Sequence, residues 1–384
     1  MSNLEIMQKR VKHLIAIKAF TRHSLPIPLP AGTSLESVVK TLYEEWEGER
    51  AGLLHIRSPI LFETLLERTS RQPKGIFPLI AEERAAMNNF AYYPSSLGPL
   101  QIRDNKGVIL GYRFKIPLDL LTTLNTSSKT LGTCGTRSSG GSGDPLARGT
   151  HESRIYSVWA DYGKKYVESS ELLRDGENGR EWLRENQELF EYCSNQLRFL
   201  CPEQYVKMKG KVVKEMGKEK SADGRRKLKP LCGAWHGVGL NQGIVSATRC
   251  HQDWMDDKRL FNCVAPFGDG FGGGDLVLWQ MRMRIGLEIG DGFFFYGSTV
   301  AHEVMEVTEG VRNSIDLFTH ASNFALLARH EEVASSVKKY PVKEQKMRDK
   351  ERKDERRMLK KNATARKEIR EGKRLRQRAA GLMR

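Results

Sequence analysis

The feature that most constrains the fold of this chain is a change in sequence texture after Pro230. From there to about residue 325 come about seven short apolar or alternating runs separated by glycines, among them GIVSATRC, LFNCVAPF, DLVLWQM, GFFFYG and RNSIDLF. Short runs rich in β-branched and aromatic residues, punctuated by glycine, are typical of the strands of a sandwich or barrel. The sequence therefore predicts a β core over residues 230–330.

The remaining chain is expected to flank this core mainly with helices, which makes the fold class α+β. An amphipathic pattern begins at the N-terminus and a second one follows Ser34, a residue type that caps helices, while GVILGYRFKIP has the composition of a strand. The expected divisions are a helical and strand region over 1–124 that packs on the core, a flexible Gly/Ser-rich loop over 125–150, a helical segment over 151–206, a Lys-rich exposed loop or hairpin over 207–229, and a basic helical tail over 337–384.

Bulk properties exclude several classes of protein. The 384 residues are 39% hydrophobic, which is enough for a sizeable core. No run approaches the roughly 18 apolar residues that a membrane helix needs, and the N-terminus has no secretory pattern. The six cysteines form no CxxC pair, which argues against a zinc or disulfide framework. We expect a protein of the cytosol or nucleus with reduced cysteines, no membrane partner and no obligate protein partner.

The net charge of +16 is concentrated in two stretches. Residues 337–384 carry 20 Lys and Arg against 7 Asp and Glu, and residues 207–229 carry 10 against 3, so the rest of the chain is slightly negative. Localised positive charge beside a folded domain is expected of a polyanion binder, and a basic tail also suits a nuclear location. A merely solvated face is the alternative for each stretch.

A metal site is indicated by two sequence features of the β core. His251 and Asp253 follow a strand-like run, and residues two apart on a strand project from the same face. His302 follows the apolar run after Gly290 and can reach them from a neighbouring strand. Two histidines and one carboxylate are the ligands of non-haem Fe(II) oxygenases. Ordinary polar roles for the same residues are the competing interpretation.

A second group of residues suits a carboxylate ligand. Arg312 and Ser314 lie in the run RNSIDLF on one strand face, ten residues beyond His302. A guanidinium can hold the distal carboxylate of 2-oxoglutarate through two hydrogen bonds, and a hydroxyl can add a third. Arg249 lies two residues before His251 on the same face, where a cosubstrate contact and a surface salt bridge are both open.

In this order, HxD, the GGDL segment Gly273–Leu276, GDGFFFYGSTVAHEV and RxS resemble the Fe(II)- and 2-oxoglutarate-dependent dioxygenases over roughly residues 230–325. The resemblance implies a double-stranded β-helix (jelly-roll) core that uses Fe(II), 2-oxoglutarate and O2. It implies His251, Asp253 and His302 as metal ligands, with no catalytic residue beyond them. Oxidative decarboxylation of the cosubstrate would be coupled to hydroxylation of a C–H bond.

Within that superfamily the whole chain looks most like the TET/JBP group, particularly its fungal members. The resemblance implies oxidation of methyl groups on DNA bases, chiefly 5-methylcytosine, with methylated duplex DNA as the partner. It assigns Arg113, in the phrase GYRFKIP, to the cosubstrate. The group has a base-contacting Asn five residues after the first metal histidine, where this chain has Asp256. Its cysteine-rich zinc region is absent from this chain.

Two further residues are candidates for the substrate pocket, each with a plainer alternative. Trp254 follows Asp253 and can stack on an extruded base or pack in the core, while Asp275 of GGDL can face the pocket or end a turn.

Three other functions stay open from the sequence. An oxidative demethylase of N-methylated bases such as N6-methyladenine would use the same site. A protein prolyl or lysyl hydroxylase is disfavoured by the localised charge. A DNA-binding protein with an inactive oxygenase fold is disfavoured by the complete set of ligands.

Overall fold

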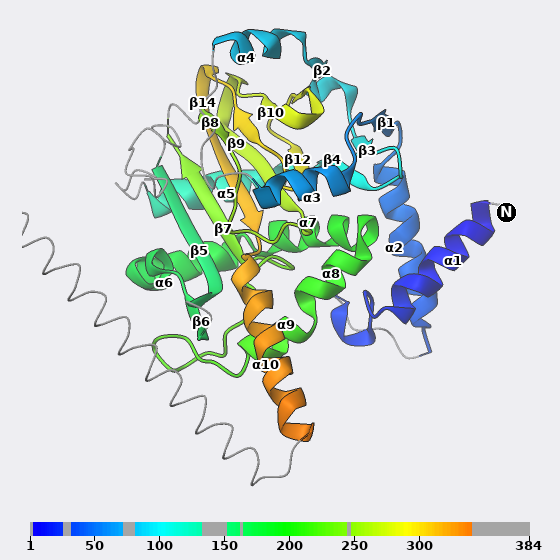
Figure 1. Cartoon of the computed structure of the whole chain (residues 1–384), viewed down its shortest axis with the longest axis vertical. Helices are drawn as coiled ribbons and strands as arrows, with labels where there is room; N and C mark the ends of the chain where they lie inside the picture. Colours follow the sequence, from blue (N-terminus) through cyan, green and yellow to red (C-terminus); the bar gives the residue numbers. More distant parts are fainter. Residues whose placement is uncertain are drawn as a thin grey trace, which may run out of the picture. The chain divides into compact units, whose positions relative to one another are not determined.

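The computed structural model describes residues 3–25, 32–71, 81–132, 152–161, 164–243 and 247–339. The chain divides into two units, Met1–Leu326 and Leu327–Arg384. The first unit contains both β-sheets and the helices around them (Figure 1). In the second unit only the end of the last helix is described, so the predicted basic tail lies almost entirely outside the described residues.

The described residues contain ten α-helices and fourteen strands. The helices are α1 Asn3–Ala16, α2 Leu35–Glu49, α3 Phe62–Arg71, α4 Ala81–Ala86, α5 Leu118–Leu131, α6 Ser170–Glu185, α7 Gln187–Leu200, α8 Pro202–Lys209, α9 Lys211–Met216 and α10 Ala321–Lys339. The strands are β1 Leu54–Arg57, β2 Ala91–Tyr93, β3 Leu100–Arg103, β4 Ile109–Lys115, β5 Glu152–Asp161, β6 Lys165–Glu168, β7 Gly237–Gln242, β8 Thr248–His251, β9 Asn262–Gly273, β10 Leu276–Leu278, β11 Met283–Ile285, β12 Asp291–Phe295, β13 His302–Val304 and β14 Val307–Phe318.

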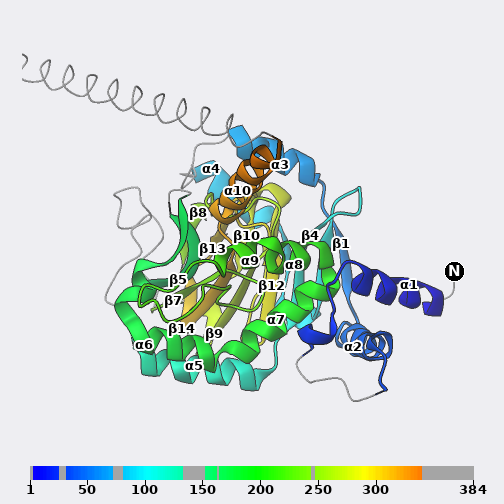
Figure 2. The same ribbon diagram turned by 90° about the horizontal axis from the view of Figure 1, so that it is seen from below.

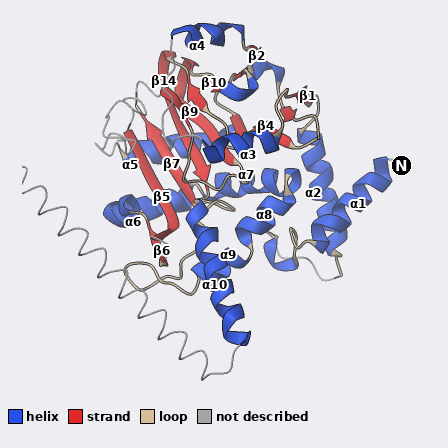
Figure 3. Cartoon of the chain, in the orientation of Figure 1, coloured by secondary structure: helices blue, strands red, loops and turns tan. Residues whose placement is uncertain are grey.

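The strands form two facing sheets, drawn in red in Figure 3. The larger has nine strands in the order β1-β3-β4-β12-β9-β14-β7-β5-β6, and the smaller has five in the order β2-β11-β10-β13-β8. Neighbouring strands are antiparallel except in the pairs β1–β3 and β2–β11. Phe295 of β12 packs against His302 of β13, with ring centroids 4.8 Å apart. This arrangement confirms the predicted jelly-roll core.

Strand β12 explains why the middle of the larger sheet is apolar on both sides. Phe293, Phe294 and Phe295 are almost fully buried because one face of the strand meets the smaller sheet and the other meets helices. On the helical side Phe294 packs against Phe114 and Trp235, at centroid distances of 4.8 and 5.7 Å. Helices α5, α6 and α7 lie along this outer face (Figure 2).

Helices α2 and α5 have residue types at their ends that favour helix termini. The Ser34 Oγ accepts a hydrogen bond from the Ser37 backbone N–H at 3.0 Å, so Ser34 is the N-cap of α2 as its residue type suggested. Helix α5 starts directly after Pro117 and is followed by Gly132 at φ +71°, a conformation that favours glycine at a helix end. Trp182 of α6 donates to the Ser128 Oγ of α5 at 3.0 Å, which joins the two helices under the sheet.

Three expectations about the flanking regions were wrong in part. Residues 151–206 are mainly helical, through α6, α7 and the start of α8, but β5 and β6 occupy 152–161 and 165–168 and join the larger sheet. The expected loop 125–150 begins with helix, since α5 extends to Leu131, and 133–150 lie outside the described residues. The Lys-rich segment 207–229 is not all loop or hairpin: it contains the end of α8 and all of α9 as well as a short hairpin.

The β core also extends beyond the expected residues 230–330. Strands β1, β3 and β4 of the N-terminal region pair within the larger sheet instead of packing on it as a separate layer. In the part of the chain that the structure describes, no helix combines the length and apolar character needed to cross a membrane.

Candidate metal centre

The three predicted metal ligands come together between the two sheets. His251 is the last residue of β8 and His302 the first of β13, and the two pair directly across these antiparallel strands. The spacing of His251 and Asp253 had suggested that both residues lie on one strand. Strand β8 instead ends at His251, and Asp253 lies just beyond it. Its backbone N–H donates to the Gly297 carbonyl at 3.0 Å, which holds it beside the histidines.

The geometry of these side chains suits a single metal ion. One ligand atom from each residue lies within 4.8 Å of the others. The Asp253 carboxylate oxygens are 3.7 Å from His251 Nε2 and 3.6 Å from His302 Nε2. His251 and His302 are only 7% and 5% exposed. Two imidazoles and one carboxylate converging in a buried position match the ligand set of non-haem Fe(II).

Backbone carbonyls fix the tautomer of both histidines. Nδ1 of His251 lies 2.7 Å from the Arg249 carbonyl, and Nδ1 of His302 lies 2.9 Å from the Val300 carbonyl. A carbonyl can only accept, so each Nδ1 carries the proton and each Nε2 keeps its lone pair toward the centre. The histidines are thus oriented as ligands by their own strands.

A glycine provides the space that the carboxylate ligand needs. A Cβ added at Gly297 would lie 2.7 Å from Asp253 Oδ2 and 3.0 Å from the Asn262 side chain. Asn262 in turn donates from Nδ2 to Asp256 Oδ2 at 2.9 Å. The wall beside Asp253 is therefore built from Gly297 and Asn262, and any larger residue at Gly297 would press on the ligand.

Arg312 provides the second half of the site. It is 1% exposed, yet its Nε and Nη2 atoms have no hydrogen-bond partner in the structure. Burial lowers the pKa of Arg312 to about 10, while the negative charge of Asp275 acts in the opposite direction. A buried guanidinium with unpaired N–H groups is costly unless an anion binds there. The carboxylate of a dicarboxylic cosubstrate satisfies that need.

The Arg312 side chain packs directly against Gly274, where any larger residue would collide with it. Gly274, at φ +73°, would put a Cβ 2.6 Å from Arg312 Cδ and 3.0 Å from its Nε. Phe271 covers another side of the guanidinium at 5.7 Å from its ring centroid. Ser314, 6% exposed, is on the same strand two residues further on, with its Oγ 3.5 Å from Asn241 Nδ2. These residues surround the buried position at which an anion would meet the Arg312 guanidinium.

A two-histidine, one-carboxylate centre in a double-stranded β-helix, together with a buried arginine whose guanidinium lacks an anion, is the arrangement expected of Fe(II)- and 2-oxoglutarate-dependent dioxygenases. The donor atoms fit Fe(II), and Arg312 fits the cosubstrate's distal carboxylate.

No family model matches the chain, and no curated protein matches it. Among solved structures the chain is similar to NgTET1 in complex with 5mC DNA, with a TM-score of 0.44 and 15% identity, covering 71% of this chain and 100% of that one. It is also similar to the viral collagen prolyl hydroxylase vCPH from Paramecium Bursaria Chlorella virus-1 in its 2OG complex (TM-score 0.30, 12% identity, 54% and 94% covered). A Pseudomonas putida prolyl-4-hydroxylase gives a TM-score of 0.33 at 12% identity, with 55% and 92% covered. Likenesses this low carry no inference about the substrate.

The structure gives the other two predicted cosubstrate residues different surroundings. Arg113 of β4 is fully buried, and it donates to four backbone carbonyls, those of Tyr93, Pro94, Gly98 and Gly286, at 2.8–3.0 Å. Its guanidinium is thus engaged in holding loops to the sheet, and a cosubstrate contact finds no support. The Arg249 side chain is exposed, and its carbonyl is the group that orients His251, so a cosubstrate contact of this side chain stays a prediction.

The predicted substrate residues fall in three different environments. Trp254 is 42% exposed and does not pack in the core. Asp256 is 7% exposed and accepts from Asn262, close to the centre. Asp275 instead pairs with Arg284, whose Nη2 lies 2.9 Å from its Oδ2, so its role is to balance the charge near Arg312.

Sequence reasoning missed four residues that shape the site: Gly274, Asn262, Arg284 and Gly297. The GSTVAH segment that precedes His302 contains a glycine that nothing in the local pattern required, and this was the available signal for Gly297. Gly274 lies in the GGDL segment, whose paired glycines were the available signal for it. Asn262 and Arg284 have no signal in the sequence alone, because their pairing with Asp256 and Asp275 depends on how the intervening turns fold.

Proposed function

We propose that this dioxygenase oxidises methyl groups on DNA bases, with 5-methylcytosine as its substrate and 5-hydroxymethylcytosine and further oxidised forms as products. The observation that carries the dioxygenase chemistry is the buried Arg312, with unpaired Nε and Nη2 atoms, in the fold that brings the three metal ligands together. Localised positive charge supports the choice of nucleic acid as the partner.

The chain's own residues bind, orient and exclude water. His251 and His302 would hold the metal through Nε2, because backbone carbonyls keep Nδ1 protonated, and Asp253 would add the negative ligand. Arg312 orients the 2-oxo acid by its far carboxylate, and Phe271 helps to keep that end dry. Bound Fe(II) and 2-oxoglutarate supply the activation of O2 that hydroxylates a nearby methyl group.

Burial of the centre implies how a base would reach it. A methyl group on a base inside a duplex cannot approach ligands that are 5–7% exposed, so the base must be extruded. Trp254 and Met255, 42% and 47% exposed, directly follow Asp253 in the chain. Large apolar side chains presented there support contacts with an extruded base or with the gap that it leaves.

The decisive experiment combines the purified protein with Fe(II), 2-oxoglutarate and DNA duplexes carrying 5-methylcytosine or N6-methyladenine, and reads the nucleosides by mass spectrometry. Oxidised cytosine that disappears in Asp253→Ala supports the proposal. Loss of the adenine methyl group alone would favour the oxidative demethylase. Succinate formation with both bases unchanged would reject a DNA base as the substrate and favour a protein side chain.

We also propose a nuclear location, supported by the basic composition of residues 337–384. Fluorescent fusions with and without this segment test it, and equal nuclear accumulation of the two would remove that support.

A further inference from the structure

The Lys-rich segment 207–229 contains two groups of basic residues with different surroundings. In α8 and near α9 the cations are engaged within the fold. Lys207 lies 2.8 Å from Asp257, Lys209 donates to the Gly233 carbonyl at 3.1 Å, and Lys218 pairs with Glu215. These three side chains are used for structure, and most of the other exposed cations lie further along the segment.

Residues 219–229 form a short, well-defined hairpin. Lys220 and Lys227 face each other in an antiparallel bridge, and the Leu228 N–H donates to the Glu219 carbonyl at 3.1 Å. The turn is closed by the Ser221 N–H donating to the Arg226 carbonyl at 2.8 Å. Leu228 is only 4% exposed, so its buried side chain attaches the hairpin to the rest of the protein.

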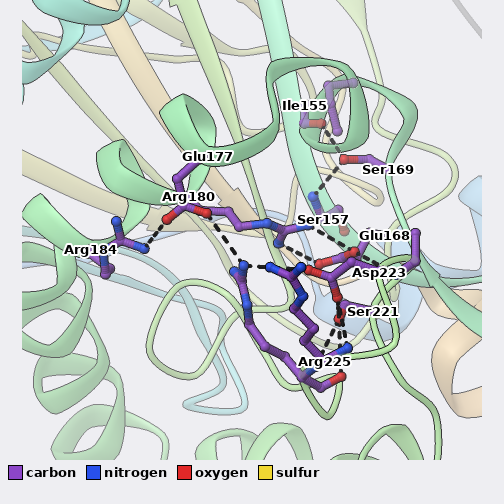
Figure 4. Close-up of polar contacts among 12 residues, drawn as sticks. Ile155, Ser157, Glu168, Ser169, Glu177, Arg180, Arg184, Ser221, Asp223 and Arg225 are labelled. Atoms are coloured by element: carbon purple, nitrogen blue, oxygen red, sulfur yellow. Dashed lines mark hydrogen bonds and ion pairs between the residues drawn. The ribbon is translucent and has the colours of Figure 1, made fainter.

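A hydrogen bond to β6 and an ion pair to α6 anchor this hairpin, in the region drawn in Figure 4. Glu168 of β6 receives two hydrogen bonds from Arg180, at 2.6 and 3.1 Å, and its Oε2 also accepts from the Ala222 N–H at 3.4 Å. Arg226 lies 3.4 Å from Glu177 of α6. The carboxylates of Glu168 and Glu177 are therefore already paired with arginines, and their contacts hold the hairpin at a fixed place on the surface.

Four cations remain directed at solvent. Lys220, Arg225, Lys227 and Lys229 are exposed, and no ion-pair partner for them exists among the described residues. Two of them stand directly opposite each other in the bridge, where like charges repel. Such an arrangement costs stability unless an anion binds between the side chains, and this is the observation that points to a ligand.

We infer that the hairpin 219–229 is a binding surface for the phosphate backbone of duplex DNA, an inference that rests on the proposed function. A two-stranded ribbon has a width that a DNA groove can accept. The duplex presents one negative charge per about 1.7 Å of its axis, so several phosphates can meet four closely spaced cations. Leu228 points into the protein, so the hairpin offers no large apolar side chain of the kind that a membrane surface would require.

The test measures the affinity of the full chain for a short unmodified duplex by fluorescence anisotropy over a series of salt concentrations. The variant Lys220→Gln/Arg225→Gln/Lys227→Gln/Lys229→Gln should lower the slope of log affinity against log salt by about 0.9 for each phosphate that is no longer neutralised. For each such phosphate, affinity should fall roughly eightfold at about 0.1 M salt. The double variant Lys220→Gln/Lys227→Gln should show about half of this effect, and it serves if the fourfold variant does not fold.

A matched control removes the same amount of charge elsewhere. Lys12, Lys18, Arg22 and Lys164 are exposed and, like the hairpin cations, have no ion-pair partner among the described residues, and their replacement by Gln should leave the salt slope unchanged. An equal fall in affinity in control and hairpin variants, or an unchanged slope in the hairpin variants, would overturn the inference. A protein that oxidises no DNA base but still binds DNA through the hairpin would refute the proposed reaction and retain this surface.

Discussion

The tight approach of Gly297 to Asp253 yields a prediction about metal binding. Its backbone lies outside the left-handed region, so alanine can adopt it, but the added Cβ would be 2.7 Å from Asp253 Oδ2. Ordinary contact begins at 3.4 Å, which requires the carboxylate oxygen to move by about 0.7 Å. Metal–ligand distances tolerate only about 0.2 Å. Gly297→Ala should therefore fold but bind metal poorly.

The magnitude follows from the role of Gly297 beside a ligand. Disturbance of groups that support a metal ligand costs about 10–100-fold in affinity, which is about 1.4–2.8 kcal/mol. Without metal the Asp253 carboxylate can turn aside, so thermal stability should change little. With saturating metal the variant should lose most of the stabilisation that metal gives to the wild type, because binding to the native state is linked to its stability.

The assay is calorimetric titration with Co(II), paired with thermal unfolding with and without the metal. Gly48→Ala in α2 is the matched control, since a Cβ there meets nothing within 4 Å. That control should bind Co(II) like the wild type. Equal Co(II) affinity in Gly297→Ala and the wild type would refute the steric argument, and it would mean that the wall beside Asp253 yields more easily than the structure indicates.

Two further predictions test the site and the core. Arg312→Lys should weaken 2-oxoglutarate binding to the Co(II)-loaded protein by about tenfold or more, because hydrogen bonds between charged groups contribute about 1.5–3 kcal/mol. The affinity for Co(II) should stay intact, and calorimetry measures both affinities. An unchanged 2-oxoglutarate affinity would contradict the assignment of Arg312. His236 is buried, with Nε2 3.1 Å from the Met208 carbonyl and Nδ1 accepting from Asn323 Nδ2 at 2.8 Å, and burial lowers its pKa from 6.5 to about 4. Because the unfolded chain binds a proton at this histidine more readily than the folded chain, the free energy of unfolding should fall as the pH drops from about 6.5 to about 4, by roughly 3 kcal/mol in all. Urea unfolding of the wild type and of His236→Gln across this pH range measures the effect. Equal pH dependence in the two proteins would refute it.

The metal ligands and Arg312 could be found from the sequence because the rules that place them are local. His251 and Asp253 are two residues apart, and Arg312 and Ser314 repeat that spacing on a second strand. Residues so close along the chain share a neighbourhood whatever the rest of the fold does. Glycine-bounded apolar runs specify strands and so indicated a sandwich or barrel, while the jelly roll itself was implied by the resemblance to the dioxygenases.

What the sequence could not provide depends on contacts between distant segments. Gly297 matters only because Asn262 and Asp253 converge on it, and the structural role of Arg113 became apparent only once its carbonyl partners were located. Strand β5 was expected to be helical although ESRIYSVWAD contains β-branched and aromatic residues, and its place in the sheet depends on pairing with the distant strand β7. The charge of the Lys-rich segment was counted correctly, but its division into engaged and exposed cations required the fold.

The position of β4 beside β12 has a consequence for how the protein is made. Lys115 of β4 pairs with Asp291 of β12, a residue 176 positions later. At roughly 5–20 residues per second, a ribosome needs on the order of 10–35 seconds to supply that partner. Until then the nascent N-terminal strands have apolar faces and unpaired edges, which is the condition in which chaperones act and aggregation begins. Yield in a heterologous host should therefore depend on translation speed and chaperone supply more than on the stability of the finished sheet.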